Sequence, residues 1–146
     1  MRAVTRTAFL LIAIVFLATN VGLTATQQQP SASAGWVTLP ASGGTTASAF
    51  VSVDNPTMYD IYLDSASADV AGKVEFRQAD ASGAIKPEAM KNVTVPAYGS
   101  LEMDPKGVQL VLSDLKRPLK DGETVTLTLS ILYGATLQVP ATVKRQ

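Results

Sequence analysis

The segment KGVQLVLSDLKRPLKDGETVTLTLSILY (106–133) contains two runs of alternating side chains. In the first run the alternating positions are Val108, Leu110 and Leu112 on one face, and Gln109 and Val111 on the other. In the second, residues 124–133, valine and leucine alternate with threonine. A period of two is typical of β-strands, because successive side chains point to opposite faces of a sheet. The segment therefore predicts two strands joined by a polar loop, each with one face in a core.

The same alternation continues through most of the chain. Further runs occupy residues 45–55, 59–68, 72–78, 92–107 and 135–143. Residues 79–90 break the pattern with Gly83 and Pro87, so we expect a loop or irregular excursion there. About seven to nine short strands separated by turn residues predict an all-β, Greek-key barrel or sandwich.

The N-terminal residues have the pattern of a signal peptide. Arg2 and Arg6 precede an apolar run over residues 8–18, which is short for a membrane span. We predict a signal peptide over 1–25, and hence an exported, periplasmic protein. Leu23 is bulky for the cleavage site, and an uncleaved signal anchor is the alternative; otherwise we expect no membrane insertion. Residues 26–35 are polar and small and predict a flexible leader, followed by a β domain over 36–146.

The composition excludes several classes of function. The 146 residues contain no histidine and no cysteine, which excludes Ser-His, Cys-His and His-metal sites, disulfides and a lipid-modified cysteine. We therefore expect no enzymatic activity. Without the two N-terminal arginines, ten Lys and Arg face twelve Asp and Glu. This balance favours neither nucleic acid nor an anionic membrane surface as a partner.

Three blocks of sequence carry a family resemblance. They are WVTLPASGGTTASAFVSVDNP (36–56), DSASADVAGKVEF (64–76) and VPAYGSLEMDPKGVQLVLSDLKRPLKDGETVTLTL (95–129). The most specific part is LKRPLKDGETVTLTL (115–129). The chain resembles the periplasmic copper(I) chaperones called PCu(A)C, over about residues 35–143. The resemblance implies a cupredoxin-like β-barrel and a family role in delivering Cu(I) toward the copper centre of cytochrome oxidase.

The resemblance also implies where copper ligands belong. Members bind Cu(I) through the pattern His-x10-Met-x21-His-x-Met, in which thioethers suit the soft monovalent ion. Here Arg77 stands at the first histidine, and Gln109 and Val111 stand at the His-x-Met pair. The other methionine falls near Lys86 or Pro87, and Met90, a few residues further on, is the nearest thioether. An arginine repels Cu(I), an amide oxygen is a hard ligand, and valine is no ligand.

Each of these positions also has an ordinary structural interpretation. Gln109 is then a solvent-facing residue of a half-buried strand. Arg77 is a surface charge paired with Glu75 or another acid. Met90 is a gap-filling side chain rather than a ligand. Val111, on the outer face, is one of the scattered exposed apolar residues that are normal; its alternative role is in an apolar patch that a partner contacts. If the mapping is right, Arg77, Met90, Gln109 and Val111 converge on one face.

Three hypotheses of function follow. The first is a family member whose copper site has degenerated, with no cofactor, acting as an accessory module beside a periplasmic metalloprotein or assembly factor. The second is a Cu(I) carrier with atypical methionine ligands, Met90 among them. The third, an enzyme, is disfavoured by the absence of histidine and cysteine. We favour the first.

Overall fold

The computed structural model describes residues 28–40 and 42–145, in which all regular structure is β-strand. The predicted signal peptide, residues 1–25, lies outside the described residues. The ten strands are β1 (Ser31–Thr38), β2 (Ala47–Asn55), β3 (Ile61–Ala68), β4 (Ala71–Ala79), β5 (Ile85–Met90), β6 (Val93–Val95), β7 (Gly99–Glu102), β8 (Val108–Leu115), β9 (Thr124–Ile131) and β10 (Thr136–Lys144). The all-β prediction is confirmed, with one strand more than the upper expectation of nine.

Two segments that the sequence analysis assigned to irregular structure are strands. β1 begins at Ser31, so the second half of the predicted leader belongs to the domain. Its first residues pair with β2, and Ala32 packs against the core. β5 lies within the predicted loop 79–90 and pairs only with β4, at one end of the strand order. An edge strand needs no apolar stripe and tolerates proline, which explains why alternation did not reveal it.

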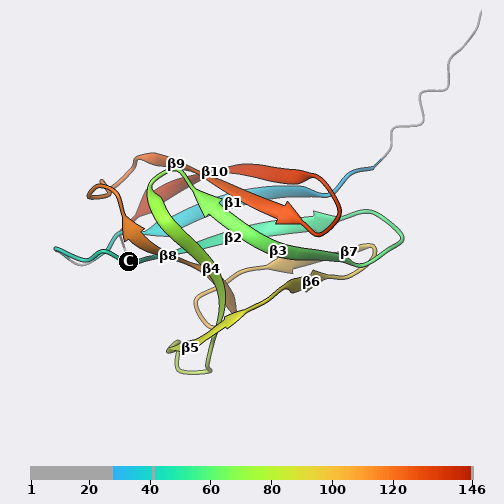
Figure 1. The fold of residues 1–146 in the computed structure, drawn as a ribbon, viewed down its shortest axis with the longest axis horizontal. Coiled ribbons are helices and arrows are strands. Elements are labelled where there is room, and N and C mark those ends of the chain that lie inside the picture. Colours follow the sequence, from blue (N-terminus) through green and yellow to red (C-terminus); the bar gives the residue numbers. More distant parts are fainter. Residues whose placement is uncertain (1–27, 41, 146) are drawn as a thin grey trace, which may run out of the picture.

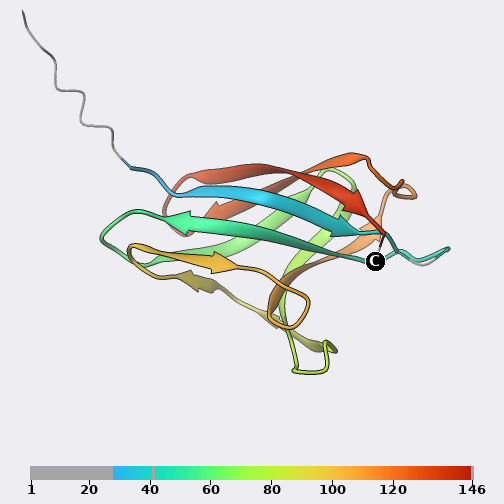
Figure 2. The same cartoon turned by 180° about the vertical axis from the view of Figure 1, so that it is seen from behind.

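The strands form one continuous sheet that curls into two layers (Figure 1). The strand order is β5-β4-β8-β2-β1-β10-β9-β3-β6, and β7 extends β2. β1 and β10 run parallel, whereas the other pairs are antiparallel. β3 and β9 lie in front in Figure 1, while Figure 2 shows β1 and β2 from the opposite side. The β4–β5 hairpin projects from the body in both views.

The core fills the space between the two layers. Leu110, Leu112, Leu127 and Leu129 are fully buried, as their alternation predicts. The whole cluster of buried apolar residues lies between Val37 and Val143. All ten strands lie within residues 31–144 of the described chain.

The two ends of the barrel differ in the segments they contain. Ser31 is opposite Asp54, which places the entry of the chain at the same end as the β2–β3 loop. The amide of Gly122 donates to the carbonyl of Val143, so the β8–β9 loop and the C-terminus share the other end. Figure 1 shows these ends on the right and left of the molecule.

Candidate functional site

The central strands bring together three of the positions singled out by the resemblance. β4 and β8 are antiparallel neighbours, with Arg77 opposite Gln109 and Glu75 opposite Val111. Side chains two residues apart share a face, so these four residues form one patch. Ala89 of β5 is opposite Arg77 and extends the patch toward the sheet edge. The convergence expected for Arg77, Gln109 and Val111 is therefore seen in the strand register.

The patch is not the solvent-facing surface that alternation predicted. Gln109 and Val111 are only 2% and 5% exposed. An inner position in the sheet does not by itself explain this burial, because β9 is also an inner strand and its Thr124 and Thr126 are exposed. Glu75 and Arg77 of β4 flank β8, and their long aliphatic stems cover apolar surface. On β2, Ser48 is opposite Val111. The solvent-facing interpretation of Gln109 and Val111 is wrong.

A ladder of alternating charges covers this patch on β4. Glu75 accepts from Lys73 at 2.8 Å and from Arg77 at 2.7 Å. The predicted Arg77–Glu75 pair is thus confirmed. Hydrogen bonds from the two cations, with that of Lys73 the stronger influence, lower the pKa of Glu75. The side chain of Lys73 is 60% exposed, whereas those of Glu75 and Arg77 are only 18% and 25% exposed. The Nε of Arg77 is buried and has no hydrogen-bond partner.

Met90 does not join the patch. It is opposite Phe76, a buried core residue, and packs against the core cluster. Met90 is therefore a packing side chain, as its ordinary interpretation held, and its expected convergence with Arg77 and Gln109 is wrong. The pairing of β5 with β4 shifts register between Arg77 and Ala79, so alternation along β5 does not fix the face of Lys86 or Pro87. The position of the family's other methionine stays a prediction, near Lys86 or Pro87.

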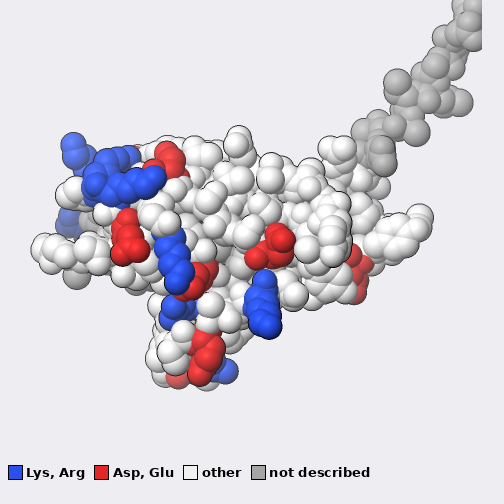
Figure 3. Space-filling view, in the orientation of Figure 1, with Lys and Arg blue, Asp and Glu red and all other residues white. Residues whose placement is uncertain are grey.

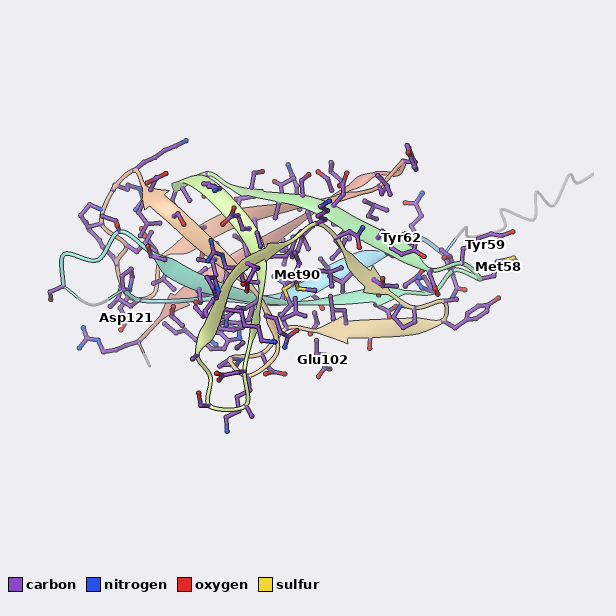
Figure 4. The ribbon with its side chains drawn as sticks, turned by 60° about the horizontal axis from the view of Figure 1, so that its bottom comes forward. Met58, Tyr59, Tyr62, Met90, Glu102 and Asp121 are labelled. Carbon is purple, nitrogen blue, oxygen red and sulfur yellow. The ribbon has the colours of Figure 1, made fainter. Side chains whose placement is uncertain are left out.

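The remaining thioethers do not supply an alternative cluster around the patch. Met58 is exposed in the β2–β3 loop, and Figure 4 shows it at one end of the barrel, whereas Met90 lies over the middle. Met103 is buried in the core. Within residues 28–40 and 42–145, no group of three or more acidic side chains is placed to hold a metal ion. The predicted ligand positions offer Cu(I) only one hard amide oxygen, from Gln109, and the cation of Arg77. These residues therefore do not fit Cu(I).

The sequence analysis missed a second cluster, made of aromatic residues. Tyr59, Tyr98 and Tyr133 are among the most exposed side chains of the described chain. They lie in loops between strands, where no alternating pattern draws attention to them. The signal available in the sequence was the position of these tyrosines close to the turn residues that separate the alternating runs.

Several solved structures have the same fold, and some of them were determined with copper bound. The Cu(I)-bound protein DR1885 from Deinococcus radiodurans is 31% identical, with 87% of this chain and 85% of that one covered and a TM-score of 0.63. The copper-bound PCuAC domain of PmoF2 is 18% identical over 82% of this chain and 95% of that one, with a TM-score of 0.69. The apo PCuAC domain of PmoF1 has a TM-score of 0.71 at 18% identity, covering 82% of this chain and 96% of that one.

These likenesses and the position of the patch define a PCuAC-type, cupredoxin-like β domain, which confirms the fold class and the resemblance stated above. A family model described as "Putative lipoprotein LpqE-like" matches residues 30–143. The chain belongs to this LpqE-like family. No functionally curated protein matches the sequence. None of the described residues forms a helix able to cross a lipid bilayer.

Proposed function

We propose that this protein is an exported accessory protein of copper-protein assembly whose own family copper site no longer holds Cu(I). On this proposal it is a binding module and no enzyme. Its partner is a periplasmic metalloprotein or an assembly factor. The membership in the LpqE-like family and the copper-bound relatives support the connection with copper. The N-terminal sequence pattern and the family description support export.

The observation that carries the proposal is the charge ladder at the ligand positions. Arg77 stands where a histidine ligand belongs, and its charge is balanced by Glu75 at 2.7 Å. Loss of one ligand alone leaves the remaining ligands in place around an incomplete metal site. Here Arg77 has instead taken the position of a ligand, and Glu75 is its counter-ion. The β4 side of the patch therefore carries paired charges, and Gln109 and Val111 are buried beside these charges.

The scaffold around the patch supports a sharp test. Arg77 and Gln109 are directly opposite, so histidines at both positions have Cα atoms about 5 Å apart. Val111 shares their face, and Pro87 is one of the two positions that the resemblance gives for the other methionine. The variant Arg77→His, Pro87→Met, Gln109→His, Val111→Met restores the family set. A control with leucine at all four positions removes the same charge and adds no ligand.

The measurement is Cu(I) competition with a chromogenic chelator under reducing conditions. We expect wild type and the leucine control to leave the copper on the chelator, and the His/Met variant to withdraw one equivalent. Tight one-to-one binding by wild type contradicts the proposal. If such binding is lost on Met90→Ala, the protein is a carrier with atypical methionine ligands.

The absence of histidine and cysteine is also the basis for proposing no enzymatic role. For the same reason, attachment through a lipid-modified cysteine is no part of the proposal, because these 146 residues contain none.

A further inference from the structure

All four tyrosines of the chain lie at one end of the barrel. Together with a methionine and a leucine they form what we call the tyrosine end: Met58, Tyr59, Tyr62, Tyr98, Leu132 and Tyr133. Tyr133 is fully exposed, Tyr98 is 72% and Tyr59 71% exposed. Figure 4 shows Met58, Tyr59 and Tyr62 at this end. An exposed group of large apolar side chains marks a contact surface.

Hydrogen bonds hold the loops of the tyrosine end together. The amide of Tyr98, in the β6–β7 turn, donates to the carbonyl of Thr57 at 2.9 Å. The amide of Leu132, after β9, donates to the carbonyl of Tyr62 at 2.8 Å. Loops that are distant in the sequence therefore present their side chains as one surface.

Two of these tyrosines have a backbone conformation that suits glycine or asparagine. Tyr98 has φ 52° and Tyr133 has φ 56°. The left-handed region disfavours a residue with a Cβ by about 1–2 kcal/mol. A bulky, exposed ring at such a position adds nothing to the core that offsets this free energy. The strain points to a role of the rings outside the folded domain.

The charge of the tyrosine end differs from that of the opposite end. Residues 54–62, 96–99 and 131–135 contain no lysine or arginine, and their acids are Asp54 and Asp60. Asp60 accepts a hydrogen bond from the amide of Ala97. Cations gather instead around residues 116–120 and Lys144, seen in blue on the left of Figure 3. We therefore expect that contact between the tyrosine end and another surface does not depend on electrostatic attraction to anions.

The chain enters the domain beside the tyrosine end. Ser31, at the start of β1, is opposite Asp54 at the end of β2. Residues 19–30 separate Ser31 from the apolar run 8–18. Even fully extended, these residues span no more than about 40 Å. In the signal-anchor alternative, in which residues 8–18 stay in the membrane, this end of the domain is held close to the bilayer; cleavage after residue 25 leaves the tyrosine end as the only membrane contact of this proposal.

We propose that the tyrosine end seats the domain on the surface of a phospholipid bilayer, with its rings among the lipid headgroups. Tyrosine is enriched at membrane interfaces because its ring is apolar and its hydroxyl reaches water. The absence of cations in the loops predicts a contact that needs no anionic lipid and withstands salt. The contact is independent of whether the protein binds Cu(I), and it involves none of the residues of the β4–β8 patch.

The test is co-sedimentation of residues 28–146 with phosphatidylcholine vesicles, with and without added phosphatidylglycerol, at low and high salt. The variant Tyr59→Ser, Tyr98→Asn, Tyr133→Asn removes three rings, and asparagine tolerates the left-handed backbone. Ile85→Ser is the matched control, because Ile85 is an exposed apolar residue of the β4–β5 hairpin, outside the tyrosine end. A cooperative thermal transition confirms that each variant is folded.

We expect wild type and Ile85→Ser to bind phosphatidylcholine vesicles equally at both salt concentrations. The triple variant loses about a hundredfold in partition coefficient, if each ring removes about 40 Å² of apolar surface from water. Failure of wild type to bind phosphatidylcholine overturns the proposal. So does binding that requires phosphatidylglycerol and disappears in salt, which assigns the contact to the cationic end. Self-association that depends on the three rings, without vesicle binding, makes a second copy the occupant instead.

Discussion

Asn55 provides the strongest test of how the loops of the tyrosine end are held. Its side chain is fully buried at the end of β2. The amide nitrogen donates to the carbonyls of Tyr59 at 2.8 Å, and of Val95 and Pro96 at 3.1 Å each. Its oxygen accepts from the Thr57 amide at 3.1 Å and the Thr57 hydroxyl at 2.7 Å. One side chain thus links the β2–β3 loop to the β6–β7 turn.

The substitution Asn55→Ala leaves these groups without their partner. A hydrogen bond contributes a net of about 1 kcal/mol, and a buried polar group left unpaired costs about 1–3 kcal/mol. The two amide hydrogens serve three carbonyls, and water reaches the more exposed partners. We therefore expect a loss of about 3 kcal/mol in the free energy of unfolding, a large fraction of the total for a domain of this size.

Urea denaturation at neutral pH measures this loss. Thr57→Val is the matched control, because it removes only the hydroxyl, and we expect a loss of about 1 kcal/mol. Asn55→Asp retains the acceptor but places an oxygen against the carbonyls of Val95 and Pro96, so it destabilises at least as much as alanine. A loss below 1 kcal/mol for Asn55→Ala refutes the argument that this side chain holds the two loops together.

Three further predictions concern other parts of the domain. A Cβ at Gly35 meets the carbonyl oxygen of Pro140 at 2.7 Å, so Gly35→Ala destabilises by about 1–3 kcal/mol in urea denaturation, and an unchanged midpoint contradicts the close approach of β1 and β10. Glycine relieves the positive φ of Tyr98, so Tyr98→Gly maintains or raises the thermal midpoint while weakening vesicle binding; a clear destabilisation indicates that the ring packs on the domain. The lowered pKa of Glu75 means that its ion pairs stabilise the fold above the unfolded value of about 4.3, and that this stabilisation is lost as the pH falls through the lower folded value. The stability difference between wild type and Glu75→Gln is therefore present at pH 7 and shrinks at pH 3, whereas an equal difference at both pH values argues against the pair.

The sequence alone was sufficient for the fold class, and it predicted which residues stand at the ligand positions. Alternation in residues 108–112 and 124–131 identified core strands, because burial of one sheet face imposes a period of two. The motif comparison placed Arg77, Gln109 and Val111 at ligand positions, and the register of β4 and β8 brings these residues together. Local chemistry also predicted the Arg77–Glu75 pair, because residues two apart on a strand share a face.

Only the tertiary structure decided what covers each face and which loops meet. Gln109 and Val111 are buried beside the long side chains of Arg77 and Glu75 on β4, and no local period encodes which side chains lie next to a strand. Met90 faces the core because β5, an exposed edge strand without an apolar stripe, pairs Met90 with Phe76. The tyrosine end exists because main-chain hydrogen bonds join loops that are far apart in the sequence. Periodicity reports one strand's exposure, whereas a site depends on which strands and loops become neighbours.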